Sequence, residues 1–216
     1  MVQNRYYHLI FRVFTIGIYC AGIAFLTPKT LHAQAQSPQK AIETFLATIH
    51  SMQFPIQDQS RHGQQVLEAN AFLDLEAMGK AALGKHWDEA TSEQQETFMN
   101  LLWQLIEHVA YARSHEFLGD FQITYPEIRP SGRGFEVQSV VQHQDEALNG
   151  KVIYHVYQEN SQWKIDDVIL DDVSLIEDMS YQFDKIIRDS SFSGLIERMQ
   201  KRLQEAKQKN IETKDA

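Results

Sequence analysis

Four stretches in the second half of the chain decide the fold: FQITY (121–125), FEVQSVV (135–141), KVIYHVY (151–157) and WKIDDVIL (163–170). Apolar and polar residues alternate along them, which is typical of strands with one buried face. Turn-forming segments separate the strands at 126–134, 144–150 and 159–161. Because connections this short join antiparallel neighbours, the four stretches predict a four-stranded antiparallel meander.

One face of three of these strands is apolar. We assign to it Phe135, Val137, Ser139 and Val141, then Val152, Tyr154 and Val156, then Trp163, Ile165 and Ile169. Side chains at alternate positions of a strand point to the same side of the sheet. We therefore expect these residues to face one common core.

Amphipathic segments stand before and after the predicted sheet. We expect helices from Ser37-Pro38 to Pro55, from Asp74 to Gly84, from Thr91 to Tyr111, from Ser174 to Ile187, and around 195–203. Their starts carry N-cap or capping-box residues, and Gly84 is a typical C-terminal stop. Helices placed before and after an antiparallel sheet predict an α+β fold.

The first 35 residues have the three parts of a secretory signal peptide. Arg5 and Arg12 supply a basic start, 13–26 is an apolar run of fourteen residues, and Ala33-Gln34-Ala35 is a small-x-small cleavage pattern. A helix of that length rises about 21 Å, short of the roughly 30 Å hydrocarbon core of a bilayer. We therefore expect cleavage after Ala35, with an uncleaved N-terminal anchor as the alternative.

Charge and cysteine content limit the possible partners. The chain has 29 acidic and 20 basic residues, a net charge of −9, which becomes −12 when the three basic residues of the signal segment are removed. We expect no nucleic-acid partner, because such proteins use Lys and Arg to neutralise phosphates. The single cysteine, Cys20, leaves with the signal segment, so the rest suits an oxidising compartment. We expect one domain over 36–206 and a polar tail at 207–216.

Motifs for catalysis or metal binding are missing from the sequence. It holds no G-x-S-x-G elbow, no H-E-x-x-H pair and no glycine-rich phosphate loop, so we expect no cofactor and no metal. One alternative is a small enzyme for an apolar substrate, with Tyr154 and Asp167 as its acid–base pair. Another is an interaction protein with a solid core.

Three blocks of residues, in a fixed order, form a further pattern. They are Leu73-Asp74-Leu75 running to Leu83-Gly84-Lys85-His86-Trp87; TSEQQETF (91–98); and Tyr154-x-Val156 with WKIDDV (163–168), Val173-Ser174-Leu175, Gln182-Phe183 and Leu195-Ile196. Together they resemble the MlaC family of periplasmic phospholipid-shuttle proteins, also called toluene-tolerance proteins. Asp171-Asp172 and Asp178-Met179-Ser180 depart from that family's Glu-Gly and Asn-Tyr-Arg, as would fit a side branch such as the relatives associated with hopanoid biosynthesis.

The resemblance implies an NTF2-like, curved, four-stranded sheet with helices packed over its concave face and at both ends. Lipid tails would occupy the hollow between sheet and helices. The protein would be a periplasmic carrier without enzymatic activity that serves outer-membrane lipid asymmetry. Its partners would be a phospholipid or related lipid, an inner-membrane ABC transporter with MCE-domain subunits, and an outer-membrane lipoprotein/porin complex.

Apolar residues in or beside the three blocks are the candidate lipid contacts. They are Trp87, Phe98, Leu102, Tyr154, Val156, Ile169, Val173, Leu175 and Phe183. Each would also suit an ordinary core, and the Tyr154 hydroxyl would need a partner there, such as a carbonyl near a lipid headgroup. The prediction requires an interior that leaves room for hydrocarbon tails.

Overall fold

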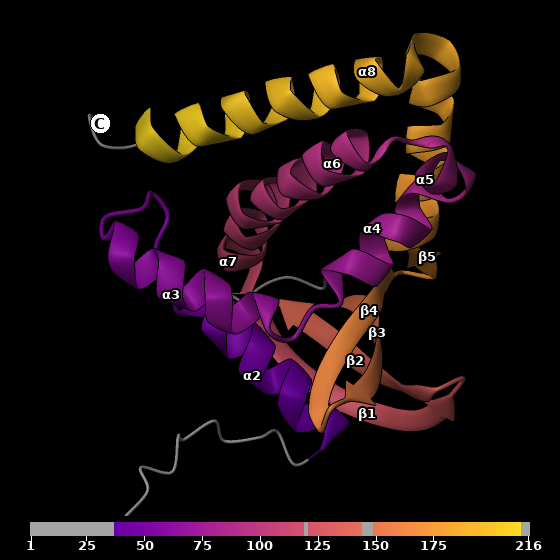
Figure 1. The fold of residues 1–216 in the computed structure, drawn as a ribbon. Helices are drawn as coiled ribbons and strands as arrows, with labels where there is room; N and C mark the ends of the chain where they lie inside the picture. Colours follow the sequence, from indigo (N-terminus) through magenta and orange to yellow (C-terminus); the bar gives the residue numbers. More distant parts are fainter. Residues whose placement is uncertain (1–36, 119–120, 144–148, 213–216) are drawn as a thin grey trace, which may run out of the picture. The chain divides into compact units, whose positions relative to one another are not determined.

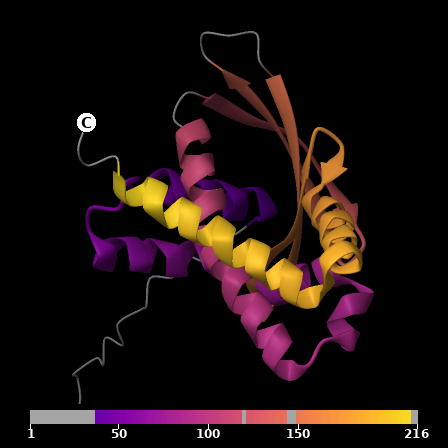
Figure 2. The ribbon, with the colours of Figure 1, turned by 90° about the horizontal axis from the view of Figure 1, so that it is seen from above.

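The computed structural model describes residues 37–118, 121–143 and 149–212. Its elements are α2 (Pro38–His50), α3 (Gln59–Asn70), α4 (Leu75–Leu83), α5 (Lys85–Glu89), α6 (Ser92–Leu105), the π-helix η1 (Ile106–Tyr111), α7 (Ala112–Leu118), β1 (Phe121–Ser131), β2 (Gly134–His143), β3 (Asn149–Glu159), β4 (Gln162–Leu170), β5 (Val173–Ser174) and α8 (Leu175–Glu212). Figures 1 and 2 show α2, α3, α6 and α7 on one side of the sheet. The predicted signal segment lies outside the described residues.

Local capping explains where the helices begin and end. The Ser37 hydroxyl accepts a hydrogen bond from the Lys40 N–H at the start of α2. Thr91 and Gln94 form the predicted capping box of α6. Gly84, at φ 52°, separates α4 from α5 in a conformation that favours glycine. These expected helix boundaries are confirmed.

Two helical features differ from the expectation. Helix α3 is absent from the sequence prediction, because it buries only His62, Val66 and Ala69 and therefore lacks a long apolar stripe. The two expected C-terminal helices form one element, α8, which breaks at Ser191 (φ 73°, ψ 170°). It continues to Glu212, so the residues assigned to a polar tail are helical up to that point.

The sheet is open and antiparallel, in the order β1-β2-β3-β4-β5. The predicted meander is therefore right, but the sheet has five strands, not four. The extra strand arises because Asp171 and Asp172, both at positive φ, turn the chain back so that Val173 pairs with Leu170. Strand β5 is short because the next residue begins α8.

A β-bulge in β4 corrects one assignment of strand faces. The register runs from His155 opposite Asp167 directly to Val156 opposite Ile165, so Asp166 is an extra residue. Beyond it, Val168 lies opposite Tyr154, and Ile169 lies opposite Ile153 on the other face. The expectation that Ile169 shares a face with Trp163 and Ile165 was therefore wrong.

The buried apolar side chains form two clusters. The first, here called the sheet cluster, joins the sheet to α2, α3, α4 and η1, and its members are Ala41, Ile42, Phe45, Ile49, Met52, Val66, Ala69, Leu73, Leu75, Met78, Tyr111, Val137, Tyr154, Val156, Trp163 and Ile165. The second, the helical cluster, joins the end of α4 to α6 and α8 through Leu83, Phe98, Leu101, Leu102, Leu195, Met199 and Leu203. We call the sheet face that carries Val137 and Tyr154 the inner face.

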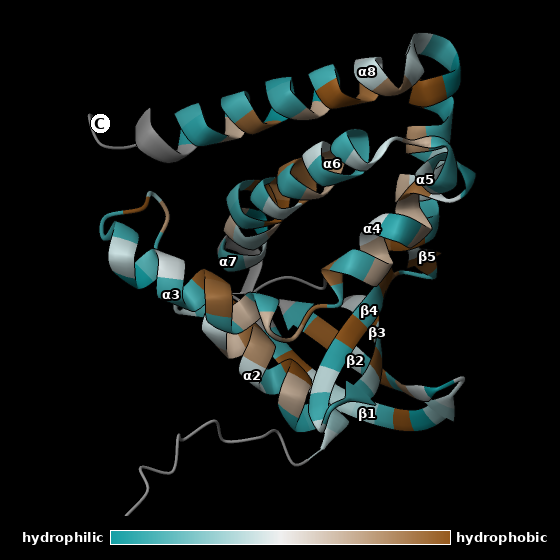
Figure 3. Ribbon diagram, viewed as in Figure 1, coloured by the Kyte–Doolittle hydropathy of each residue, from teal (hydrophilic) through white to brown (hydrophobic). Residues whose placement is uncertain are grey.

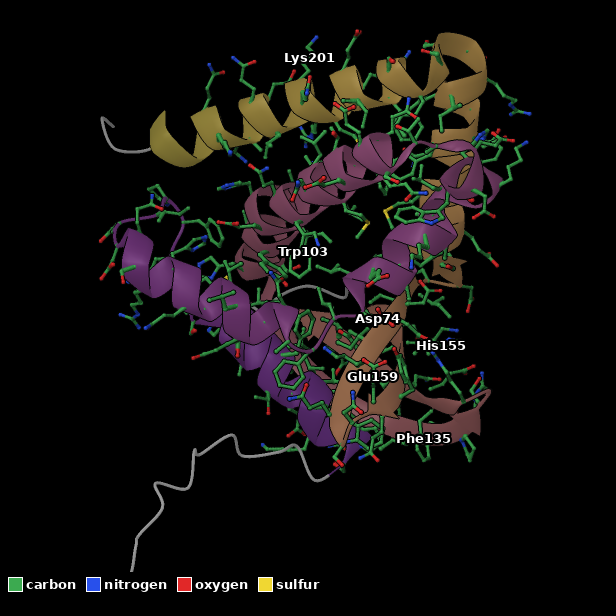
Figure 4. All side chains as sticks on the ribbon, viewed as in Figure 1. Asp74, Trp103, Phe135, His155, Glu159 and Lys201 are labelled. Atoms are coloured by element: carbon green, nitrogen blue, oxygen red, sulfur yellow. The ribbon has the colours of Figure 1, made fainter. Side chains whose placement is uncertain are left out.

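The distribution of polar residues agrees with these layers. Figure 3 shows hydrophobic residues alternating with hydrophilic ones along the strands. The second half of α8 turns its apolar side toward α6, while Lys201 lies on the side away from α6 (Figure 4). Over the described parts of the chain, no helix combines the length and apolar character that a membrane span needs.

Hydrogen bonds fix the start of α4 to the sheet. The Ile165 N–H donates to the Phe72 carbonyl at 2.6 Å, and the Asp74 N–H donates to the Ile165 carbonyl at 2.9 Å. The Tyr157 hydroxyl donates to the Asp74 carboxylate, which also caps α4. The Arg133 guanidinium covers the Tyr157 ring at 3.5 Å from its centre. The segment leading into α4, which contributes Leu73 and Leu75 to the sheet cluster, is therefore fixed against β3 and β4.

Candidate functional site

Half-buried apolar side chains surround the sheet cluster from both of its sides. Phe54, Phe72 and Phe135 are three of them. The other six are Tyr125, Val152 and Val168 from the strands, and Leu46 of α2, Ile106 of η1 and Ile176 of α8. We call these six residues the apolar wall. These side chains pack against a buried core and keep part of their apolar surface accessible. Exposure of that surface to water is unfavourable in free energy, so it suits contact with a hydrocarbon chain.

The polar groups beside this wall are hydroxyls. Ser139 is fully buried on the inner face and donates to the Val152 carbonyl at 3.2 Å. The buried Tyr154 hydroxyl bonds with Ser139, and burial raises the pKa of Tyr154. Burial also raises the pKa of Tyr125 to about 12. These groups are neutral at physiological pH and suit the recognition of uncharged acceptors.

The nine candidate lipid contacts divide among several places. Tyr154 and Val156 belong to the sheet cluster. Phe98 and Leu102 belong to the helical cluster, against which Trp87 and Phe183 also pack. The Phe98 and Phe183 rings meet edge to face with centroids 5.7 Å apart. The structure therefore brings four of the nine together around α6, two on the inner face, and leaves three outside both clusters.

The remaining three lie near the β4–β5 edge of the sheet. Ile169 is on the face opposite Tyr154, as the bulge dictates. Leu175 is the half-buried first residue of α8. Val173 is 56% exposed and pairs with Leu170, which is 43% exposed. These three belong to neither of the two clusters to which the other six contribute.

Sequence reasoning missed all six residues of the apolar wall as functional candidates. Tyr125 and Val152 stand in strands of period two, and that alternation was a usable signal. Val168 was hidden by the bulge. Leu46 and Ile106 are partly exposed because of the way neighbouring helices pack over them. No local sequence pattern predicts that degree of exposure.

The proposed acid–base pair is separated in the structure. Asp167 Oδ2 accepts a hydrogen bond of 2.6 Å from the Ser174 hydroxyl, and Oδ1 accepts from the backbone N–H groups of Val168 and Ile176. Asp167 therefore caps α8. Tyr154 lies one position away in the register, opposite Val168, so its side chain points to the other face of the sheet.

Two surface depressions lie away from the inner face. One, of about 470 Å³, lies between the start of α6 and the second half of α8, with Thr91, Gln94, Phe192 and Ile196 in its lining. The other, of about 420 Å³, lies where Gly84 and His86 meet Tyr181 and Asp184 of α8. None of the nine candidate contacts lines either depression.

One carboxylate joins α5 to α8 beside the second depression. Asp184 Oδ1 lies 2.9 Å from His86 Nε2 and 3.2 Å from Lys85 Nζ. The hydrogen bond from His86, followed by that from Lys85, lowers the pKa of Asp184. In the described ranges, no group of three His, Cys, Asp or Glu side chains is placed to hold a metal ion.

Comparison with known proteins identifies the family. A family model described as MlaC protein matches residues 39–201, which include the whole sheet, the sheet cluster and the helical cluster except Leu203. The chain belongs to the MlaC family. A search of curated protein sequences found no match to this MlaC-family chain.

A solved structure supports the fold of this MlaC-family chain. The phospholipid-binding protein from Ralstonia solanacearum, in complex with a phospholipid, superposes with a TM-score of 0.61 at 21% sequence identity. The match covers 78% of this chain and 95% of that one. At this identity the likeness establishes a shared fold, and the resemblance read from the three sequence blocks is confirmed by the family model.

Proposed function

We propose that this protein is a periplasmic lipid carrier that binds a phospholipid, or a related lipid, and moves it between membrane complexes. Membership of the MlaC family over residues 39–201 carries the proposal. The phospholipid-bound Ralstonia solanacearum protein of the same fold supports the ligand class. The apolar wall supports it from the chemistry of the chain itself.

The tails would lie against the apolar wall and the inner face. The nine candidate contacts stay predictions, with Tyr154 and Val156 best placed at the inner face and Val173 at its edge. The neutral hydroxyls of Ser139 and Tyr154 would meet the ester groups where the tails begin. Ile169 would contact lipid only if the tails also reached the outer face.

Room for the tails would come from the boundary between the two clusters. Among the described residues, Ile106 of η1 is the one that packs against both clusters. The sheet cluster itself consists of buried side chains packed together. We expect the layer of α6 and α8 to separate from the sheet around Ile106 when a lipid binds.

Energetics make a docking partner necessary for release. Burying one methylene contributes about 0.8 kcal/mol, so a chain of roughly fifteen gains on the order of 12 kcal/mol by leaving water. A carrier that matches this gain would release lipid slowly into water. Release should therefore be fast only when an apolar channel of a partner meets the site. Equal release rates with and without a partner would contradict this step.

The expected partners are an inner-membrane ABC transporter with MCE-domain subunits and an outer-membrane lipoprotein/porin complex. The acidic chain, at −9 overall, favours basic docking surfaces. Binding to them should weaken as salt increases, because salt screens charges on exposed surfaces. MlaC-family proteins are periplasmic, and we propose the same compartment here, reached through cleavage after Ala35. The NTF2-like description of the sheet likewise stays a prediction.

Mass spectrometry of lipid extracted from the purified protein tests the ligand. We expect close to one phospholipid per chain, or a related lipid if the departures at 171–172 and 178–180 change the cargo. Protein that carries no lipid and takes none from phospholipid vesicles would refute the carrier, and would favour a solid-core interaction protein.

An enzymatic role has no support in the site, because the Asp167 carboxylate is engaged at the start of α8 and faces away from Tyr154.

A further inference from the structure

The inner face of the sheet reaches solvent along one row of residues. Ser139, Val152, Leu170 and Val173 are register partners in succession across β2, β3, β4 and β5. Partners in a ladder point to the same side of a sheet, so the four side chains form a line on the inner face. We call them the edge row.

Exposure increases along the edge row from the interior outward. Ser139 is fully buried, Val152 is half-buried, Leu170 is 43% exposed and Val173 is 56% exposed. A short edge strand of a soluble protein commonly carries charged side chains at such positions. Here two large apolar side chains occupy the outer end, and they are continuous with Val152 of the apolar wall.

The backbone holds this outer end in a defined position. The Lys151 N–H donates to Asp171 Oδ1, and the Asp171 N–H donates to the Lys151 carbonyl, both at 3.0 Å. Lys151 Nζ also pairs with the Asp172 carboxylate. The turn between Leu170 and Val173 is therefore fixed to β3, although both of its residues have positive φ. Ile176 of the apolar wall is the second residue of α8, which follows β5 directly.

From this line we infer that the edge row is the portal through which an acyl chain passes between solvent and the inner face. The inference rests on the proposed function and names the route to its site. The occupant is a hydrocarbon chain and not a protein surface, because two partly exposed side chains offer far less than the roughly 800 Å² that each partner of a stable protein interface buries. A single acyl chain needs only such a narrow apolar track.

Lipid exchange kinetics test the portal. The purified protein is mixed with vesicles of phosphatidylethanolamine and phosphatidylglycerol that carry a pyrene-labelled phospholipid, and the rates of uptake and release are recorded. We expect Leu170→Gln and Val173→Gln each to slow both rates at least fivefold. In Leu170→Gln the fraction of protein loaded at equilibrium should change less than twofold, because a portal affects passage in both directions equally. Val173 is also a candidate lipid contact, so for Val173→Gln the rates alone test the portal.

Two exposed apolar residues elsewhere provide matched controls. Leu67 of α3 is 72% exposed and Ile128 of β1 is 41% exposed, and neither belongs to the edge row or the apolar wall. Leu67→Gln and Ile128→Gln should exchange lipid at the wild-type rate. All four replacements are at exposed positions, and their thermal unfolding confirms that they fold.

The outcomes separate the portal from the carrier function. Wild-type rates in the edge-row variants, or equal slowing in the controls, would refute the portal while leaving lipid binding intact. Loss of equilibrium loading in Leu170→Gln through faster release, with uptake unchanged, would make Leu170 part of the binding site and not its portal. A wild-type protein that neither takes up nor releases the labelled lipid would refute both proposals.

Discussion

Tyr154 and Val168 lie opposite each other across β3 and β4 on the inner face of the sheet. The pairing exists because Asp166 is an extra residue in β4, which reverses the side-chain alternation after it. Ile169 therefore belongs to the outer face. Val168 and Ile169 are adjacent in the sequence but lie on opposite faces, so replacing each in turn tests which face of the sheet binds lipid.

Val168→Gln should lower the amount of phospholipid bound per chain, whereas Ile169→Gln should leave it unchanged. The polar side chain at 168 enters the apolar wall, but the one at 169 points away from it. Lipid phosphorus per mole of purified protein measures the result, with circular dichroism as the control for folding. Equal loss in both variants would show that the inner face alone does not define the site.

Asp167→Ala should reduce the free energy of unfolding by about 1–3 kcal/mol, because it leaves the Ser174 hydroxyl and the Ile176 N–H of α8 without their acceptor. Urea denaturation measures the change. Asp178→Ala is the matched control, since Asp178 is exposed on the same helix and bonds only with Gln182 among the contacts of the structure; it should stay within about 0.5 kcal/mol. A similar loss in both variants would contradict the capping role.

Acid should weaken the junction of α3 with η1. The hydrogen bond with His62 lowers the pKa of Glu107 from 4.5, and burial lowers the pKa of His108 from 6.5. A group whose pKa is lowered by folding stabilises the protein above its unfolded pKa, and this contribution is lost as the pH falls. Protonation of His108 should therefore lower the free energy of unfolding below about pH 6.5, and protonation of Glu107 should lower it below about pH 4.5.

Urea denaturation at a series of pH values tests this junction. The free energy of unfolding should decline from pH 7 downward, and less steeply in His108→Gln and Glu107→Gln within their respective ranges. Lys207 of α8 and His62 of α3 also face this group, and both are retained in the wild type and in the two variants. Identical slopes in the wild type and both variants would show that the junction does not titrate on unfolding.

Two glycines should respond to alanine in opposite directions. A Cβ at Gly134 would lie 2.0 Å from the Val156 carbonyl oxygen, so Gly134→Ala should destabilise the protein by about 1–3 kcal/mol. Gly63 lies within α3 with open space around it, and Gly63→Ala should stabilise the protein by about 0.5–1 kcal/mol. Thermal unfolding of both variants provides the measurement. Stabilisation by Gly134→Ala would mean that β2 and β3 can move apart at that point.

Much of the fold was predictable because its signals are local. The period-two strands, the Ser37 and Thr91 caps and the Gly84 stop each act within a few residues, and the structure has them where they were expected. The weakly apolar α3 and the two-residue β5 gave no comparable signal. The candidate site was less predictable, since the nine chosen residues are apolar for different reasons and lie in two clusters and at one edge.

The fold class, the antiparallel order of the main strands and the family could be predicted from local patterns, because alternation, capping residues and ordered motifs are properties of neighbouring residues. Three features depended on packing between distant segments: Val168 replaces Ile169 on the inner face, Ile106 adjoins both clusters, and Leu170 and Val173 are exposed to solvent. The physical reason is that a bulge, a shared contact and an exposed edge each depend on which distant segment lies alongside. These features therefore cannot be predicted from neighbouring residues alone.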